Sequence, residues 1–460
     1  MLFFVLHIAN LLVTAQFIDN KVPKPYMDEI FHVPQAQQYC RGDYYTWDQK
    51  LTTPPGLYIA SNIIAWIGSL FSFDLCTVNS LRFTNILFSI GLYLVLVSLV
   101  TTLYPATKNC SNTKLYALTL AWFPIGFFYN FLYYTDPGST FLVLLSYLLV
   151  KKKRYTISGL VGMVSLAFRQ TNVVWLCLFM VVTIIDTLSN IGDSKKNDNT
   201  GVRFYNPKCS SIQQPSEMFR SIYSLTINTL KNIKTILPNI ATFLLGIASF
   251  AVFLIWNGGI VLGDRSNHAA GLHFPQIFYY SSFLSFFAAP WTLSCAPVLK
   301  LFGIKSLIYG AASTLIALFL VYKFTHEHPF ILSDNRHYTF YVWHRVYKRH
   351  WIVRYGLAPV YTVSEFLNIR AFSEHTSFLL ALGYFVALML SLVPSPLLEF
   401  RYFIIPFLFY MVHIPPPTQM MRAVVGLGLY LSIHVITVYL FVYKPFIWTD
   451  QPDRLQRFLW

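Results

Sequence analysis

The chain has 460 residues, of which 55% are hydrophobic, 18% aromatic and only 12% charged, and its mean hydropathy is +0.51. A water-soluble protein of this size carries about 25% charged residues. The composition therefore excludes soluble, disordered, coiled-coil and disulfide-rich secreted proteins, and it indicates an all-α polytopic membrane protein. The net charge of +15 is typical of basic cytoplasmic loops, and no basic stripe on a soluble domain points to nucleic acid.

The predicted membrane spans begin at the N-terminus. Residues 1–17 have no charged leading region and no cleavage site, so they predict a first span rather than a removed signal peptide. Further apolar stretches lie at residues 83–103, 115–132, 138–150, 155–168, 173–185, 236–256, 277–298, 306–324, 353–366, 377–393, 402–412 and 424–442. Several are shorter than the ~20 residues of a full crossing, which favours helices that end against a polar cavity. In all we expect about 12–14 transmembrane helices.

Basic segments set the expected topology. The KKKR run at residues 151–154 and the Lys-, Asn- and Ser-rich stretch at 187–234 are predicted to be cytoplasmic. Because the chain between them must return to the side it left, residues 155–185 predict a hairpin with its tip at 169–172. The same reasoning predicts a hairpin over residues 115–150.

The opposite face is expected to hold most of the unusual polar segments. Residues 20–81 predict one long loop between the first two spans, in which residues 55–73 form a helix lying on the membrane surface. The hairpin tip at 133–136 and the loop at 258–274 join this face. The chain thus divides into a membrane module at residues 1–186 with its first non-cytoplasmic loop at 20–81, a cytoplasmic loop at 187–235, and a second membrane module at 236–460.

Acidic residues beside a bilayer indicate function or pairing, because an isolated charge there is costly. Asp28 and His32 lie four residues apart and share one face of a helix predicted between Pro25 and Pro34. Gln, His, Trp and Thr residues surround them. The alternative is a capped surface helix whose acids merely face water.

Other charged clusters leave a similar choice open. Arg169 interrupts an apolar hairpin, so its guanidinium either binds a lipid phosphate or pairs with an acid that braces two spans. The segments at 264–273 and 333–338 carry the same ambiguity. Glu399 and Arg401, two apart on a helix, do not face each other and are expected to have different partners.

Signals for metals and nucleotides are weak. His326 and His328 form an HxH pair, but Pro329 follows and no third ligand is obvious. The six cysteines are scattered without metal spacing and say little about the redox compartment. The sequence holds no Walker loop, GxGxxG, GxSxG or HExxH motif, which excludes soluble-nucleotide chemistry and zinc-protease chemistry.

Eight segments together resemble one family. They read PYMDEIFHVPQAQQYC (25–40), WDQKLTTPPGLY (47–58), FLYYTDPGS (131–139), FRQTNVVW (168–175), NGGIVLGDRSNH (257–268), DNRHYTFYVW (334–343), LLEFRYFIIP (397–406) and QRFLW (456–460). Almost end to end, except at residues 187–234, the chain closely resembles the dolichyl-phosphate-glucose-dependent α-1,2-glucosyltransferases of asparagine-linked glycosylation. Asp136-Pro137 after the YYT run is a mild variation on the family pattern.

The resemblance implies a GT-C glycosyltransferase of the endoplasmic reticulum membrane, with its active site facing the lumen and a catalytic acid in the first lumenal loop. The family reaction moves glucose from dolichyl β-phosphoglucose to Glc2Man9GlcNAc2-diphosphodolichol. It forms the terminal α-1,2-linked glucose, the last step of lipid-linked oligosaccharide assembly, and the product passes to oligosaccharyltransferase.

A β-linked donor and an α-linked product mean inversion by one in-line displacement. Such a transfer needs a carboxylate to take the acceptor hydroxyl proton and cations to hold the departing phosphate. That phosphate is already a good leaving group, so we expect no general acid, no metal and no other cofactor.

The resemblance and this chemistry together assign roles. Asp28 is the expected base, and Glu29 is the second choice. The expected donor-phosphate residues are Arg169, Gln170, Asn172, Arg336, His337 and Arg401. The expected acceptor residues are His32, Trp47, Asp48, Asp136, Asp264 and His268, because aromatic faces and carboxylates suit sugars.

Two other functions compete with this one. A non-catalytic membrane protein of the same fold would act as an auxiliary subunit or channel modulator, and the intact Asp28 and RQTN run (169–172) argue against it. A transporter should show an internal repeat or paired broken spans in its two halves, and the sequence shows neither.

Overall fold

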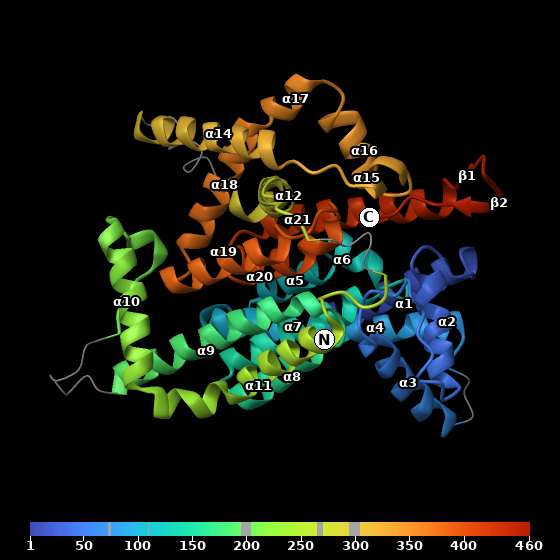
Figure 1. Cartoon of the computed structure of the whole chain (residues 1–460), viewed down its shortest axis with the longest axis horizontal. Helices are drawn as coiled ribbons and strands as arrows, with labels where there is room; N and C mark the ends of the chain where they lie inside the picture. Colours follow the sequence, from blue (N-terminus) through green and yellow to red (C-terminus); the bar gives the residue numbers. More distant parts are fainter. Residues whose placement is uncertain (72–74, 109, 195–203, 265–269, 294–303) are drawn as a thin grey trace.

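The computed structural model describes residues 1–71, 75–108, 110–194, 204–264, 270–293 and 304–460. These residues form a bundle of helices, most of which run along the longest axis of the molecule, and a two-stranded antiparallel sheet near the C-terminus (Figure 1). The longer helices are α1 (Leu2–Lys21), α2 (Glu29–Cys40), α3 (Gly56–Ser69), α4 (Val78–Leu103), α5 (Ser111–Ala121), α7 (Thr135–Lys151), α8 (Tyr155–Leu166), α9 (Val173–Ser194), α10 (Pro215–Lys231), α11 (Ile233–Asn257), α12 (Pro275–Thr292), α14 (Ile304–Phe324), α18 (Ala358–Ser373), α19 (Phe378–Leu392) and α21 (Met420–Tyr443). The short elements are η1 (Pro105–Thr107), α6 (Pro124–Tyr129), η2 (Gln170–Asn172), η3 (Cys209–Ser211), α15 (Pro329–Ser333), α16 (Tyr338–Val342), η5 (Trp343–Tyr347), α17 (Trp351–Gly356), η6 (Phe400–Phe403), α20 (Ile404–Val412), β1 (Phe446–Trp448) and β2 (Gln451–Gln456).

The predicted all-α, multi-pass membrane architecture is confirmed. Within the described residues, six helices are long and apolar enough to cross a bilayer: Leu2–Lys21, Val78–Leu103, Gln170–Ile191, Ile233–Asn257, Ser306–Phe324 and Met420–Tyr443. Shorter apolar helices, among them α8 and α19, pack against α9 inside the bundle. The larger number expected from the sequence counted such short helices as spans.

The two predicted hairpins have their tips at the same end of the bundle, as predicted. At one end of the bundle, Lys151 of the KKKR run pairs with Asp186 of α9 at 3.0 Å. At the other end, Arg169 pairs with Asp136 at 3.2 Å, so the two hairpin tips meet. The loop after α11 joins this second end, because the Asp264 amide donates to the Gln49 carbonyl at 2.7 Å.

The first loop forms a lobe beside this end of the bundle (Figure 1). Its helix α3 has 14 residues, too few to span a bilayer, and packs on α2. Helix α2 differs from the prediction, because it starts at Glu29 and passes through Pro34 to Cys40. A disulfide between Cys40 and Cys76 holds its far end. The cysteines therefore do carry redox information, since disulfides persist in oxidising compartments.

Two predicted segments differ from the structure for local reasons. The apolar stretch at residues 115–132 is not one helix: α5 ends before Phe123 and α6 begins at Pro124, whose ring cannot continue the hydrogen-bond ladder. The break places Phe123 against Phe407, with ring centroids 4.2 Å apart, in the aromatic core. The polar segment at 187–235 is not only a loop, because it contains the end of α9 and all of α10.

Candidate functional site

Three charged residues, Asp28, Glu399 and Arg401, form what we call the central ion cluster. Arg401 Nη1 donates to Asp28 Oδ2 at 3.0 Å, Arg401 Nη2 donates to Glu399 Oε1 at 3.2 Å, and Arg401 Nε donates to Glu399 Oε2. The Asp28 side chain is 37% exposed, whereas that of Glu399 is 11% exposed. Glu399 thus anchors the guanidinium from the protein side, and Asp28 keeps carboxylate surface open to a ligand.

The N-terminus of α2 positions Asp28. Asp28 is the N-cap residue, and Met27 before it has a left-handed φ of 58° that turns the chain into the helix. The Asp28 amide donates to the Tyr134 hydroxyl at 3.2 Å, which links it to the hairpin tip. The hairpin tip therefore holds the backbone of Asp28, while Arg401 holds its carboxylate.

Glu29, one residue further on, points into the protein. Its side chain is 0% exposed and accepts hydrogen bonds from Arg82 Nε and Nη2 at 2.8 and 2.6 Å. The amides of Tyr26 and Tyr133 also donate to it, at 3.0 and 2.6 Å. Arg82 also pairs with Asp19 at 3.0 Å. Glu29 was the second choice for the base, but its carboxylate is enclosed and fully hydrogen-bonded.

The protonation states around Asp28 follow from burial and charge. Burial raises the pKa of Asp28, but the charge and hydrogen bond of Arg401, together with smaller effects of the neighbouring histidines, lower it further, and the net pKa lies below the ordinary value. The same balance lowers the pKa of Glu399. Burial lowers the pKa of His32 to about 4, so His32 is neutral at physiological pH. Its Nδ1 lies 2.6 Å from the Tyr58 hydroxyl.

Arg169 lies next to the central ion cluster. Its Nη2 lies 3.2 Å from Asp136 Oδ1, and its guanidinium lies 5.6 Å from the centroid of the Tyr402 ring. Arg401 lies 5.9 Å from the same ring. The buried Nε of Arg169 has no hydrogen-bond partner among the described residues. Arg169 therefore forms an ion pair with Asp136, as one of the two interpretations predicted, and its Nε–H remains an unpaired donor among the described residues. Asp136, predicted to bind acceptor, is buried in this pair.

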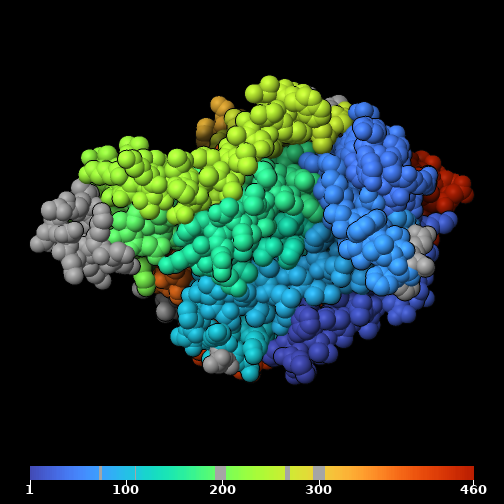
Figure 2. All heavy atoms as spheres, turned by 90° about the horizontal axis from the view of Figure 1, so that it is seen from below, coloured from blue at the N-terminus to red at the C-terminus, as the bar shows by residue number. Residues whose placement is uncertain are grey.

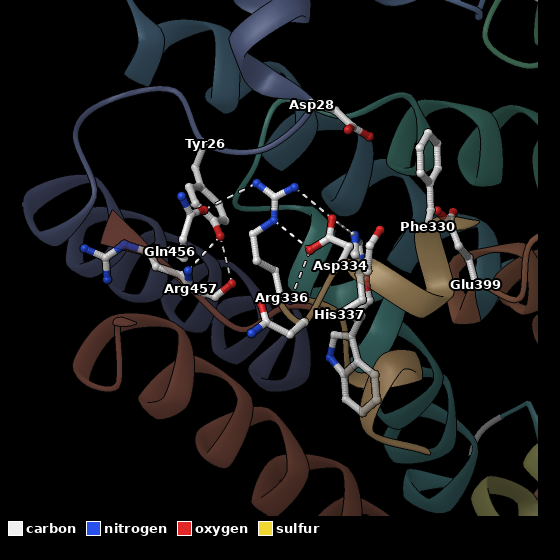
Figure 3. Close-up of polar contacts among 12 residues, drawn as sticks. Tyr26, Asp28, Phe330, Asp334, Arg336, His337, Glu399, Gln456 and Arg457 are labelled. Carbon is white, nitrogen blue, oxygen red and sulfur yellow. Dashed lines mark hydrogen bonds and ion pairs between the residues drawn. The ribbon is translucent and has the colours of Figure 1, made fainter. Parts of the chain in front are cut away.

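The segment at 334–337 meets the C-terminal residues. Arg336 donates to Asp334 Oδ1 and Oδ2 at 2.8 and 2.7 Å, and the Leu459 amide donates to the Arg336 carbonyl at 3.0 Å. His337 Nδ1 lies 3.0 Å from the Trp460 carbonyl oxygen. Figure 3 shows Asp334, Arg336 and His337 beside Gln456 and Arg457, with Asp28 and Glu399 nearby. His337 is also close enough to lower the pKa of Asp28 and of Glu399. Its effect on each pKa is smaller than the effects of burial and of Arg401.

One expectation about pairing is wrong. Glu399 and Arg401 were expected to have different partners, yet Arg401 binds both Glu399 and Asp28. The reason is backbone geometry: Glu399 is extended, with φ −131° and ψ 130°, ahead of the 3₁₀ turn η6. In extended chain, side chains two residues apart lie on the same side. Asp334 and Arg336 pair in the same way.

Gln170 and Asn172 have structural contacts. Gln170 Nε2 donates to the Thr52 carbonyl at 2.7 Å and ties the hairpin tip to the first loop. Asn172 is buried, and its amide nitrogen donates to Ser139 Oγ and to the Ser165 carbonyl at 2.8 and 2.9 Å. Both were expected to bind donor phosphate. Their side-chain amides hold the tip in place, and their role at the donor phosphate stays a prediction.

The predicted acceptor residues separate into two groups. His32 lies inside, one helical turn from Asp28. Trp47 and Asp48 lie in the outer loop, where Trp47 Nε1 donates to the Leu51 carbonyl at 3.2 Å and Asp48 is exposed. Asp264 is exposed and belongs to the loop that binds the Gln49 carbonyl. His268 lies outside the described residues.

The described residues contain no group of three or more His, Cys, Asp or Glu side chains placed to hold a metal ion. In the HxH segment, Glu327 pairs with Lys348 at 2.8 Å. His328 Nδ1 accepts from the Phe330 amide at 3.2 Å.

Sequence reasoning missed several residues that build the site. Arg82 was not singled out, although an Arg near the start of an apolar helix is a signal for a buried anion partner. Tyr134 and Tyr402 flank the Arg401 guanidinium, both with ring centroids 5.9 Å away. No sequence signal indicated that the C-terminal residues contact Tyr26, whose hydroxyl donates to the Arg457 carbonyl at 2.8 Å.

Comparisons with a family model and with known relatives point to the same family. The DIE2/ALG10 family matches residues 22–412. The Dol-P-Glc:Glc(2)Man(9)GlcNAc(2)-PP-Dol alpha-1,2-glucosyltransferase of Rattus norvegicus is 40% identical over 449 residues, which cover 95% of this chain and 93% of that protein. Proteins of the same name from Homo sapiens and Arabidopsis thaliana are 39% and 35% identical, over 95% and 96% of this chain and 93% and 96% of the relatives.

Among solved structures, the Archaeoglobus fulgidus oligosaccharyltransferase aligns with a TM-score of 0.29 and 12% identity, over 89% of this chain and 54% of that chain. A likeness of this size carries no argument about the fold or the function.

The enclosed position of Glu29 predicts a stability effect. Glu29→Gln removes the charge that compensates Arg82, and breaking a buried ion pair from one side costs about 3–5 kcal/mol. We expect a large fall in melting temperature in detergent, measured by tryptophan fluorescence. Asp28→Asn is the matched control, because its carboxylate is partly exposed, and it should melt within a few degrees of the wild type. Equal melting temperatures for Glu29→Gln and wild type would contradict this assignment.

Proposed function

Because the chain belongs to the DIE2/ALG10 family, we propose that it transfers glucose from dolichyl β-phosphoglucose to Glc2Man9GlcNAc2-diphosphodolichol. The bond formed is the terminal α-1,2 linkage, and the product is the substrate that oligosaccharyltransferase takes. The proposed location is the endoplasmic reticulum membrane, with the central ion cluster facing the lumen in a GT-C arrangement. The Cys40–Cys76 disulfide supports a lumenal first loop, since disulfides are rare in the cytosol.

The observation that carries this proposal is the contact between the partly exposed carboxylate of Asp28 and the guanidinium of Arg401. A second acid, Glu399, holds this guanidinium. Inverting transfer needs a base for the acceptor hydroxyl beside a cation for the departing phosphate. These two groups are 3.0 Å apart here. Glu29 is left out because its carboxylate is enclosed.

Arg401 has hydrogen-bonding capacity left for the donor phosphate. A guanidinium carries five N–H donors, and three of them contact Asp28 and Glu399. The remaining donors, with Arg169 Nε and His337, form the proposed phosphate site. Gln170 and Asn172 are left out because their side-chain amides bind other parts of the protein. Arg336 contacts Asp334 and Gln456 through three donors and, like Arg401, keeps two, so it stays a candidate.

Donor binding is also proposed to raise the pKa of Asp28. In the free protein Arg401 lowers the pKa of Asp28, which weakens it as a proton acceptor. A bound phosphate shares the Arg401 charge and adds a negative charge nearby, and both effects raise the pKa of a carboxylate. Asp28 therefore becomes a stronger base only when the donor is in place, and it then takes the proton as the acceptor oxygen attacks C1.

The acceptor sugar chain is proposed to enter over the outer loops. Asp48 and Asp264 are exposed there, and Trp47 offers an aromatic face. The Gln49 carbonyl, which accepts from the Asp264 amide, joins the two loops. His32, neutral and hydrogen-bonded to Tyr58, forms the inner wall next to the base. Asp136 is not included, because it pairs with Arg169.

Replacing the proposed base tests the mechanism. Asp28→Asn keeps the size of the side chain but cannot accept a proton, and general-base catalysis contributes about 10²–10⁴-fold. We expect turnover to fall by about that factor in an assay with dolichyl-phosphoglucose and the Glc2-capped acceptor. Donor and acceptor binding should change far less, because the lost interaction acts in the transition state. Near-normal turnover of a folded Asp28→Asn protein would move the base elsewhere, with Asp48 the next candidate.

A pair of variants separates phosphate binding from bracing at Arg169. Arg169→Lys keeps the charge but loses the planar fork, so the donor KM should rise by about 10-fold or more if charge-assisted hydrogen bonds worth ~1.5–3 kcal/mol are lost. Asp136→Asn removes the brace and leaves Arg169 intact, so its donor KM should stay near that of the wild type. Equal effects of the two substitutions would mean that Arg169 only braces Asp136.

Chelation tests the proposed absence of a metal. The donor leaves a phosphate monoester that side chains are proposed to hold, so glucose transfer should continue at its full rate in EDTA. Loss of activity in EDTA and recovery with Mg²⁺ or Mn²⁺ would instead make the acids metal ligands.

A further inference from the structure

Helix α10 presents its apolar residues outward. Phe219, Tyr223 and Leu230 are 73%, 66% and 65% exposed. Their spacings of four and seven residues place them on one face of the helix. Met218 and Ile222 are also exposed, beside this face. The result is a continuous apolar strip along the outer side of α10.

The opposite face of α10 packs on the protein mainly through polar residues, together with the partly buried Leu225. Ser221, Ser224 and Asn228 are the buried residues of the helix. Ser224 Oγ accepts from the Tyr205 amide at 2.9 Å, and Asn228 Nδ2 donates to Ser224 Oγ at 3.2 Å. A helix at a water-exposed surface has the reverse arrangement, with its apolar stripe toward the core. The outer face of α10 therefore fits an apolar environment.

The position of α10 identifies this environment as the bilayer. The helix lies across the ends of α9 and α11, at the end of the bundle away from the first loop (Figure 1). It leads after Asn232 into α11, a candidate membrane span whose outer residues Leu237 and Leu245 are exposed. Figure 2 shows the surface of the two helices running on without interruption. The strip thus adjoins the outer surface of a candidate membrane span.

Basic residues lie along one side of the strip. Arg220 and Lys231 are exposed, and the helical spacing places them together between the apolar and the buried faces of α10. Lys234, exposed in the first turn of α11, follows them in the chain. The acid of α10, Glu217, is occupied by the amides of Gln213 and Gln214 at 2.8 and 3.1 Å. Cations beside an apolar helix face are typical of helices that lie in the membrane interface and attract anionic lipid.

We propose that α10 is an interfacial helix that buries Phe219, Tyr223 and Leu230 in the leaflet opposite the central ion cluster. Lys231 and Lys234 then bind the headgroups of anionic lipids. This site is separate from the transfer chemistry and does not depend on it.

The experiment uses the full-length protein in nanodiscs with a genetically encoded fluorescent amino acid at Phe219 or Tyr223. Gln213, exposed just before the helix, is the control position. A nitroxide on the lipid acyl chain should quench the labels at Phe219 and Tyr223 several-fold more than the label at Gln213, and aqueous iodide should do the reverse. Iodide quenching at Phe219 and Tyr223 would overturn the proposal. Protection of both from both quenchers would mean that protein covers the strip, and would overturn it equally.

A second experiment tests whether α10 prefers anionic lipid. The label at Tyr223 should be quenched more strongly by lipid nitroxide in equal parts phosphatidylserine and phosphatidylcholine than in phosphatidylcholine alone. Lys231→Gln with Lys234→Gln should abolish this difference. Lys444→Gln, an exposed lysine after α21, should preserve it. A difference that persists in the double variant would overturn the headgroup contact.

Discussion

The buried ion pair between Glu29 and Arg82 fixes the geometry of the whole candidate site. Arg82 of α4 reaches Glu29 of α2, Asp19 of α1 and the Val22 carbonyl, so one guanidinium joins three helices. Glu29 in turn accepts from the Tyr133 amide at the hairpin tip. Because the environment is desolvated, each charge depends on its partner. Asp28 owes its direction to this arrangement, since it precedes the residue that is locked inside.

The charges near Asp28 are arranged as shared pairs. Arg401 contacts Asp28 and Glu399, and Arg169 contacts Asp136, while Tyr402 lies against both guanidiniums. Shared pairs compensate the carboxylates when no ligand is bound, which stabilises the site beside a bilayer. They also leave N–H donors and positive charge for an additional anion. A donor phosphate bound as proposed would compete with Asp28 for Arg401, which would link donor binding to the basicity of Asp28.

The two ends of the bundle interact with their surroundings in different ways. The end with the hairpin tips gathers acids, guanidiniums and aromatic rings around a partly open carboxylate. The other end carries the KKKR run and α10, where the buried residues are polar and the exposed ones apolar. The proposed transfer site and the proposed lipid contact of α10 therefore lie at opposite ends of the bundle.

The sequence by itself determined the membrane architecture and the relation between the hairpin tips. These follow from local quantities: apolar length, the positions of basic runs and the parity of crossings. The family resemblance singled out the motif that contains Asp28. The resemblance also ranked Asp28 ahead of Glu29 as the base, but the sequence did not show which carboxylate is enclosed, because that depends on the location of Arg82. Only the tertiary structure decided that Arg401 joins Glu399 to Asp28, that Cys40 bonds to Cys76, and that the C-terminal residues contact Tyr26. Most of these contacts join residues far apart in the chain, so no periodicity or propensity encodes them, and the Glu399–Arg401 pair depends on an extended backbone at a position where the sequence predicted a helix.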